Sequence, residues 1–310
     1  MNRIKSQIAL TREDGQMQRM LFEDNLPVAP RVAPFKSQLL KWVGSKQRSA
    51  HQIISYFPDE FGTYIEPFLG SAGVLATLAP KRALASDVFR PLIEIWQALH
   101  DAPQTLKDWY ASRRRRMMAG DKVEEYETIK AAYNARPNGA DLLFLCRSCY
   151  GGVVRFRKAD GFMSTPCGVH TPIDAKSFAA RVDEWKRRTT GASFKVMDYV
   201  EAMRKATKGD LVYCDPPYKD TQKILYGAQA FDLRQLFETV RECKNRGVYV
   251  ALSIDGTKRS GDFVCDIAMP DGLFEREVFV GCGRSMLRRF QMVGKTLEGE
   301  IVADRLLLTY

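Results

Sequence analysis

Four consecutive residues, Asp215-Pro216-Pro217-Tyr218, have side chains and carbonyls that could hold and polarise an amino group. They directly follow the apolar run Leu211–Cys214, which has the pattern of a buried strand. Because neither proline donates a backbone N–H, the proline carbonyls stay free to accept hydrogen bonds. A carboxylate and a carbonyl can accept both hydrogens of an exocyclic amine, and a tyrosine ring can stack on a planar base. The group predicts a catalytic site for a planar, amine-bearing substrate; the alternative is a surface turn.

A second group, between Glu66 and Asp87, predicts a binding site for a small ligand. Gly70 and Gly73 lie between a predicted strand and a predicted helix, so a ligand can approach the backbone closely and meet the helix N-terminus. The G-x-G-x-x-G pattern and a following phosphate-binding lysine are missing, which argues against a nucleoside triphosphate. Asp87 ends the next predicted strand, where an acid commonly binds ribose hydroxyls; its alternative role is a helix N-cap.

The loop Lys41–Lys46 precedes both groups. Its tryptophan, glycine and lysines suit a cover over a nucleoside cofactor, and the alternative is an ordinary basic turn. The three groups are far apart in the sequence, so the fold must bring them together.

Two segments, residues 36–100 and 191–310, have the pattern of an α/β domain. In the first, a strand, a glycine turn, a helix, a second strand and a second helix follow one another. In the second, the amphipathic helix Phe231–Arg246 lies among apolar strands predicted at Ser193–Val196, Leu211–Cys214, Val248–Ile254 and Leu306–Tyr310. Continuous apolar strands are typical of parallel sheets covered on both faces. The alternation predicts a doubly wound, mostly parallel sheet.

Residues 101–190 interrupt this pattern and predict an inserted, largely separate module. They are rich in helix formers up to Ala135 and then rich in glycine. Val153–Arg157 and Phe162–Thr165 flank a turn and predict a β-hairpin. Residues 1–35 are polar, end in three prolines and predict an accessory arm.

The net charge of +10 and the pI near 9.2 favour a polyanionic partner such as nucleic acid. Residues 101–190 hold 17 Lys and Arg against 11 Asp and Glu, so the insert carries +6 of that charge. Seven cysteines without a signal peptide indicate reduced thiols of a cytosolic protein, and no apolar run is long enough to span a membrane. Cys146, Cys149, Cys167 and His170 have the spacing of a zinc site, and the alternative is that Cys146 simply packs within the apolar run Leu142–Cys146.

In their order and spacing, these motifs resemble those of the Dam-like, alpha-class DNA adenine methyltransferases. That family shows Lys-Trp-x-Gly-x-Lys, Glu-Pro-Phe-x-Gly-x-x-Gly and Asp-Pro-Pro-Tyr, matched here by Lys41–Lys46, Glu66–Gly73 and Asp215–Tyr218. Phe194 and Asp198 match an element that flanks the cofactor adenine. The resemblance covers residues 36–310 and implies an S-adenosylmethionine-dependent methyltransferase fold with a target-recognition domain at residues 101–190.

The resemblance implies site-specific methylation of the exocyclic amine of adenine in duplex DNA, with the base flipped out of the stack and no metal. The catalytic residues would be Asp215, Pro216, Pro217 and Tyr218. The cofactor-binding residues would be Trp42, Gly44, Lys46, Glu66, Phe68, Gly70, Asp87, Phe194, Asp198 and Asp215. A cytoplasmic, DNA-associated protein of bacterial or phage origin would be expected, as a monomer or homodimer.

The insert resembles the family's base-reading hairpin. Arg155 matches an arginine that reads guanine, and Tyr150 matches an aromatic that fills the stack beside the flipped base. Phosphate contacts would come from Arg113, Arg114, Arg157 and Lys158. Gly151 and Val169 stand where the family has asparagine and arginine, so the resemblance does not imply a GATC recognition site.

Several alternatives stay open. The same chemistry could act on RNA adenine, DNA cytosine or a protein glutamine, although the basic insert favours duplex DNA. A DNA-binding protein that has lost catalysis would have no reason to retain Asp215–Tyr218. A zinc-stabilised DNA-binding module fused to an unrelated α/β domain is a third alternative.

Overall fold

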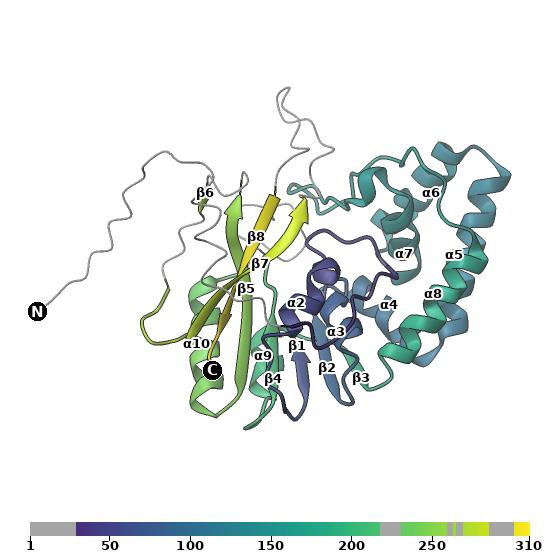
Figure 1. The fold of residues 1–310 in the computed structure, drawn as a ribbon. Helices are drawn as coiled ribbons and strands as arrows, with labels where there is room; N and C mark the ends of the chain where they lie inside the picture. The colour runs from purple at the N-terminus through teal and green to yellow at the C-terminus, as the bar shows by residue number, and fades with distance from the viewer. Residues whose placement is uncertain (1–28, 218–230, 259–262, 265–268, 285–300) are drawn as a thin grey trace, which may run out of the picture.

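The fold was analysed in a computed structural model, which describes residues 29–217, 231–258, 263–264, 269–284 and 301–310. Tyr218 and most of the expected N-terminal arm lie outside the described residues. Within the described part, eight strands form one sheet in which seven follow the order β3-β2-β1-β4-β5-β8-β7, and β6 pairs with β5 (Figure 1). The strands are β1 (Tyr64–Glu66), β2 (Ala83–Asp87), β3 (Ala192–Val196), β4 (Leu211–Cys214), β5 (Tyr249–Lys258), β6 (Phe263–Val264), β7 (Arg276–Arg284) and β8 (Ile301–Leu308).

Strands β1 to β5 are parallel to one another, whereas β8 is antiparallel to β5 and β7 is antiparallel to β8. This confirms the predicted mostly parallel sheet. The strand order reverses between β1 and β4, since β2 and β3 lie on one side of β1 and β4 and β5 on the other. A crevice at the carboxyl ends of the strands is expected at such a reversal.

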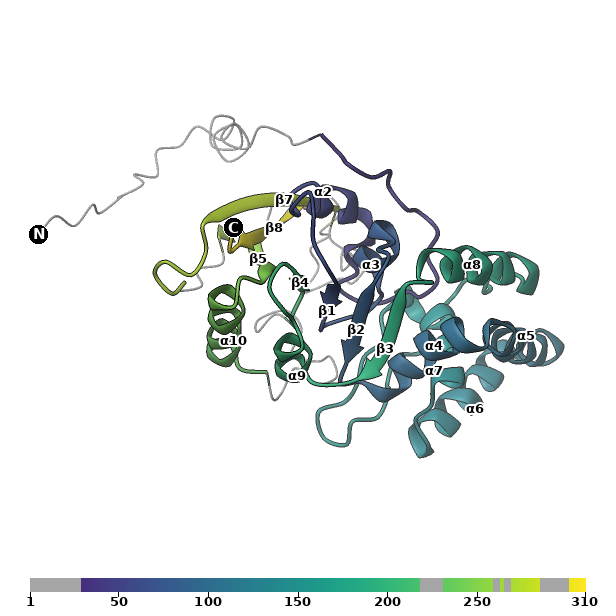
Figure 2. The same ribbon diagram turned by 90° about the horizontal axis from the view of Figure 1, so that it is seen from below.

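Helices cover both faces of the sheet because its strands are apolar on both sides. In β4, Leu211 and Tyr213 belong to one hydrophobic cluster, whereas Val212 and Cys214 belong to the other. The first cluster includes α2 (Ala50–Ile54), α3 (Gly73–Leu78) and α4 (Arg90–Asp101). The second includes α9 (Tyr199–Arg204) and α10 (Leu233–Asn245). Figure 2 shows α9 and α10 on the side of the sheet opposite to α2 and α3. This two-sided cover is the doubly wound arrangement that the sequence predicts.

The insert consists of α5 (Pro103–Ala119), α6 (Lys122–Ala135), α7 (Gly139–Ser148) and α8 (Ala175–Arg188), which lie beyond β3 and α4 (Figures 1 and 2). Its apolar side chains join the core of the sheet instead of forming a separate one. Trp185 of α8 stacks on Trp96 of α4 with ring centroids 5.4 Å apart. The indole of Trp185 also donates to the carbonyl of Ser37, 2.8 Å away, so α8 holds the segment that leads to the Lys41–Lys46 loop.

The predicted hairpin of the insert is confirmed as an antiparallel pairing after α7. Phe156 pairs with Met163, and Cys149 pairs with Cys167. The backbone N–H of Arg157 donates to the carbonyl of Phe162 at 2.9 Å. Both pairings are isolated β-bridges outside the named strands, and Cys149 faces Cys167 across one of them.

Two searches of the described residues bear on binding partners of other kinds. No group of three or more His, Cys, Asp and Glu side chains among them could hold a metal ion. No described helix is long and apolar enough to cross a membrane.

Candidate active site

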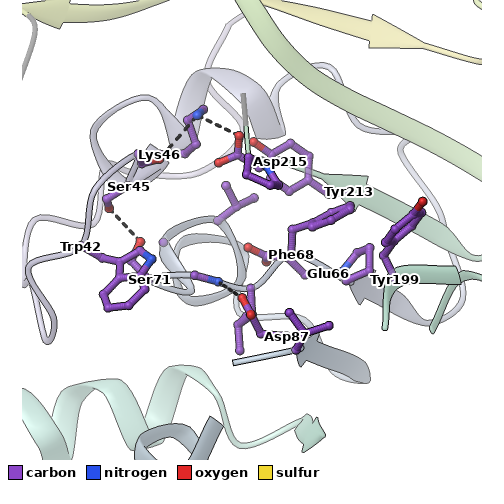
Figure 3. Close-up of a pocket in the computed structure, with 18 of the residues that line it drawn as sticks. Trp42, Ser45, Lys46, Glu66, Phe68, Ser71, Asp87, Tyr199, Tyr213 and Asp215 are labelled. Atoms are coloured by element: carbon purple, nitrogen blue, oxygen red, sulfur yellow. Dashed lines mark hydrogen bonds and ion pairs between the residues drawn. The ribbon is translucent and has the colours of Figure 1, made fainter. Parts of the chain in front are cut away.

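A cavity of about 310 Å³ lies where the strand order reverses, at the carboxyl ends of the parallel strands (Figure 3). A volume of this size suits a small organic ligand or cofactor. The three motif groups predicted from the sequence meet here. Its described lining includes Trp42, Gly44, Lys46, Glu66, Phe68, Gly70, Asp87, Asp198, Tyr199, Tyr213, Asp215, Pro217 and Phe231.

Asp215 follows the last residue of β4 and forms one wall of the cavity. Its Oδ1 lies 2.8 Å from the ammonium of Lys46, which belongs to the short 3-10 helix η1 (Lys46–Arg48). The Lys46 side chain is only 7% exposed and the Asp215 side chain 18% exposed, so the pair is largely shielded from water. Pro216 is buried and Pro217 lines the cavity. The sequence places Lys46 with the cofactor, whereas the structure brings its ammonium to the predicted catalytic carboxylate.

Glu66 ends β1 in the cavity wall and is 3% exposed. The hydroxyl of Tyr64, two residues earlier on the same strand face, donates to Glu66 Oε2 at 2.8 Å. Burial, opposed by the Tyr64 hydrogen bond and helped by the nearby Asp215 carboxylate, raises the pKa of Glu66 to about 8. Glu66 is therefore mostly neutral at pH 7. A neutral Glu66 adds no negative charge beside the Asp215–Lys46 ion pair.

The glycine turn after β1 and the Lys41–Lys46 loop are joined to each other. Gly70 has φ +48°, a conformation that favours glycine, and its Cα side lies in van der Waals reach of the Trp42 ring, so the indole packs on the turn. The hydroxyl of Ser71 donates to the hydroxyl of Ser45 at 2.8 Å. This contact fixes the loop over the mouth of the cavity.

Asp87 ends β2 and lines the cavity, as the sequence predicts for a ligand-binding acid. Its Oδ2 accepts from the backbone N–H of Gly70 at 3.2 Å, and its Oδ1 accepts from that of Phe89 at 3.0 Å. The Asp87 carboxylate thus holds in place both the glycine turn after β1 and the turn between β2 and α4. A carboxylate has lone pairs left after two such bonds, so a role toward ligand hydroxyls is compatible with these contacts.

Three aromatic rings form an apolar side of the cavity. Phe68 stacks on Tyr199, with centroids 5.0 Å apart and planes at 25°, and meets the edge of Phe231 at 5.9 Å. Tyr199 and Phe231 were not predicted from the sequence. Tyr199 follows Asp198 directly, which is a usable signal, whereas Phe231 has none apart from preceding an amphipathic helix.

Of the two predicted residues Phe194 and Asp198, only Asp198 lines the cavity. Asp198 lines the cavity and also caps α9 by accepting from the backbone N–H of Val200 at 2.8 Å. Phe194 is 4% exposed and stacks on Trp96 in the core at a centroid distance of 6.2 Å. The structure therefore places Phe194 in the packing between β3 and α4 and not at the cavity, because Phe194 lies in the middle of β3 whereas the cavity lies at the carboxyl ends of the strands.

The arginines predicted to contact phosphates are partly committed to the insert itself. Arg113 forms an ion pair with Asp141 of α7, with Nε 2.7 Å from Oδ1. Arg114 donates to the carbonyl of Pro172 at 3.3 Å. Arg157 pairs with Asp160, with Nε 3.0 Å from Oδ1, and lies over the ring of Phe162. These contacts hold helices and hairpin together, so an arginine run alone is a poor guide to a phosphate contact.

The remaining predicted nucleic-acid contacts lie on the hairpin. Lys158 is exposed at the hairpin turn, Arg155 is half-buried, and Tyr150 is 38% exposed. Gly152 has φ +68°, and a Cβ there would lie 2.7 Å from Lys41. The base of the hairpin therefore packs directly against the start of the loop that covers the cavity.

Comparison with known proteins agrees with this arrangement. A family model described as D12 class N6 adenine-specific DNA methyltransferase matches residues 42–271. The type II methyltransferase M1.LlaDCHI of Lactococcus lactis subsp. cremoris is 26% identical over 69% of this chain and 79% of its own length. The DNA N-6-adenine-methyltransferase of Escherichia phage P1 is 28% identical over 73% of this chain but only 30% of its own length. The DNA adenine methylase of Vibrio cholerae is 27% identical over 58% of this chain and 64% of its own length.

Among solved structures, the rRNA methyltransferase aviRa from Streptomyces viridochromogenes has a TM-score of 0.34 and 12% identity, covering 96% of this chain and 94% of that one. A similarity at that level supports no functional inference. The family match spans the Lys41–Lys46 loop from Trp42 onward, the glycine turn, the insert and Asp215–Tyr218. The chain belongs to the D12 class N6 adenine-specific DNA methyltransferase family.

Proposed function

We propose that this chain transfers a methyl group from S-adenosylmethionine to the exocyclic amine of adenine in duplex DNA, with the base flipped out of the stack. The observation that carries the proposal is the position of Asp215. It leaves β4 at the strand-order reversal, in the wall of a cavity that the glycine turn and the Lys41–Lys46 loop also line.

The cavity residues fit S-adenosylmethionine. The stacked rings of Phe68 and Tyr199 offer an apolar side for a planar adenine, and Trp42 lies at the glycine turn. Asp87 and Asp198 supply carboxylates for polar groups of a nucleoside. When bound, the cofactor supplies an electrophilic methyl group on a sulfonium sulfur.

Asp215 and the carbonyl of Pro216 would accept the two hydrogens of the target amine. Accepting both hydrogens fixes the orientation of the nitrogen and makes its lone pair more available. Lys46, at 2.8 Å, holds the Asp215 carboxylate in place and favours its ionised form. Tyr218 would stack on the flipped base, an assignment that rests on its place in the motif.

The insert would bind the duplex beside the cavity. Arg155 would read a guanine through its two major-groove acceptors, and Tyr150 would fill the space that the flipped base leaves. Lys158, exposed at the hairpin turn, would contact a phosphate, which orients the duplex without reading its sequence. Because the base of the hairpin packs on Lys41, DNA bound at the hairpin would lie close to the cavity mouth.

The test is radiolabelled methyl transfer from S-adenosylmethionine to unmethylated genomic DNA, followed by digestion to nucleosides. Label on adenine that disappears in Asp215→Ala, with cofactor binding retained, supports the proposal. The exposed Asp59→Asn serves as the matched carboxylate control. Label on cytosine, or transfer to RNA only, would show the substrate assignment to be wrong, and failure to bind the cofactor would reject the enzyme assignment.

A further inference from the structure

The ammonium of Lys46 lies between two carboxylates from distant parts of the chain. Its Nζ is 2.8 Å from Asp215 Oδ1 and 3.4 Å from Asp304 Oδ2. The Asp304 side chain is 13% exposed, so this second contact is also shielded from water. Lys46 is the only basic residue among the described residues that line the cavity. A single buried ammonium thus links the predicted catalytic carboxylate to a carboxylate on the far strand β8.

The backbone around Asp304 departs from a regular sheet on both sides. The pairing of β5 with β8 shifts register between Asp255 and Thr257, and that of β7 with β8 shifts between Gly281 and Gly283. At Gly256 a Cβ would lie 2.5 Å from the carbonyl oxygen of Ala303, so only glycine allows this approach. Such irregularities change the direction of a side chain and are common beside active sites. Here they accompany the turn of Asp304 toward Lys46.

The surroundings make a second partner for Lys46 useful. An ammonium on a long, flexible side chain has several rotamers. Besides the two carboxylates, Lys46 Nζ donates to the carbonyl of Gly44 in its own loop at 3.4 Å. With only Asp215 and this neutral carbonyl as partners, Lys46 could follow the carboxylate out of position when an amine binds. A fixed carboxylate behind the ammonium prevents this.

We propose that Asp304 is a positioning residue for methyl transfer, which holds Lys46 against Asp215 so that Asp215 presents its free lone pairs to the target amine. Asp304 itself touches neither base nor cofactor. The inference rests on the proposed function, because it assigns Asp215 to the amine.

A double-mutant cycle of single-turnover methyl transfer tests this role. Asp304→Asn keeps the shape of the side chain and should lower the single-turnover rate constant about 10- to 100-fold, since loss of position at reacting groups has effects of that size. Affinities for S-adenosylmethionine and DNA should stay unchanged. In a Lys46→Met background, Asp304→Asn should have almost no further effect, because its partner is already gone. Asp304→Glu should restore part of the rate.

The matched control is Glu277→Gln. It removes a carboxylate of β7 that pairs with Arg305 of β8 at 2.6 Å. Because Asp304 and Arg305 are neighbours on β8, their side chains face opposite sides of the sheet, so this pair lies on the side away from Lys46. This variant should transfer methyl groups at the wild-type rate.

A second measurement does not depend on methyl transfer. Lysines are acetylated with an N-hydroxysuccinimide ester, and each site is quantified by peptide mass spectrometry. Lys46 should be acetylated slowly in the wild type and severalfold faster in Asp304→Asn, whereas the exposed Lys158 should react equally in both. Equal thermal unfolding of the two proteins would show that faster acetylation comes from Lys46 and not from loss of the fold.

The outcomes separate the two proposals. A wild-type protein that transfers no methyl group to adenine rejects the proposed function, and the acetylation rates then still decide whether Asp304 holds Lys46. A wild-type protein that does transfer it, with Asp304→Asn at the same rate, rejects the inference alone. Effects of Asp304→Asn and Lys46→Met that multiply independently, or unchanged acetylation of Lys46, also overturn it.

Discussion

Replacing Glu66 with glutamine should stabilise the protein, by an amount that grows with pH. The folded state raises the pKa of this buried carboxyl from 4.5 to about 8, chiefly through burial. Between these two values the unfolded chain has lost the proton while the folded chain keeps it. Folding therefore takes up a proton, and the free energy of unfolding of the wild type falls as pH rises through this window. Below the window the carboxyl is neutral in both states, and this loss disappears.

The size of the effect follows from the shift. A change from 4.5 to about 8 is about 3.5 pH units, and at about 1.4 kcal/mol per unit the full loss is about 5 kcal/mol as an order of magnitude. Over an accessible range of about pH 5.5 to 8, about 3 kcal/mol of that difference should be visible. Glutamine fits the test because it is neutral at every pH and keeps an acceptor for the Tyr64 hydroxyl.

The assay is urea unfolding of both proteins without cofactor, followed by circular dichroism at half-unit pH steps. The quantity of interest is the free energy of unfolding of Glu66→Gln minus that of the wild type, in which other titrating groups cancel. It should rise with pH and level off above about pH 8. Glu60→Gln, at an exposed position before β1, controls for removal of a carboxyl group in general. A difference for Glu66→Gln that stays constant across the range would refute the reasoning.

Other substitutions separate structural from functional roles. Arg113→Ala should lower the free energy of unfolding by about 2 kcal/mol, because it removes the ion-pair partner of the largely buried Asp141, and urea unfolding would show it. In DNA binding at several salt concentrations, Arg113→Ala should keep the wild-type salt dependence, whereas Lys158→Ala should reduce the slope of log K against log salt by about one. Phe194→Ala should destabilise the fold by about 3 kcal/mol and leave the affinity for the cofactor unchanged. Phe68→Ala should weaken cofactor binding about tenfold in calorimetry. The reverse pattern would contradict the placement of Phe194 in the core. Gly191→Ala, whose Cβ would clash with the carbonyl oxygen of Lys81, should lower the free energy of unfolding by about 2 kcal/mol, and an unchanged melting temperature would contradict that geometry.

Local patterns were sufficient to predict the parts of the fold that depend on local chemistry. The strand Leu211–Cys214 has the observed bounds of β4, because four apolar residues stop at an acid and two prolines. The hairpin of the insert was predictable because apolar residues alternate around a glycine turn. Leu306–Tyr310 was predicted as the last strand, but β8 spans Ile301–Leu308, because the polar pair Asp304-Arg305 separates its apolar start from its apolar end.

Local sequence patterns could not predict contacts between side chains that are far apart in the chain. Nothing near Lys46 indicates that its ammonium would meet Asp304, because the contact depends on the order of strands across the sheet. The run of arginines on α5 is similar: charge alone does not show that Arg113 has a partner on α7. Phe194 was assigned to the cofactor by resemblance, but it lies in the middle of β3 and packs on Trp96 of α4 in the core.

The most direct test of the central claim is single-turnover methyl transfer to adenine in duplex DNA by Asp215→Asn. This variant keeps the size of the side chain and removes its charge. The account predicts a rate constant at least about 100-fold below that of the wild type, since Asp215 acts on the amine during transfer. Binding of S-adenosylmethionine should be unchanged. A variant that methylates adenine at the wild-type rate would contradict the assignment of Asp215 to the reacting amine.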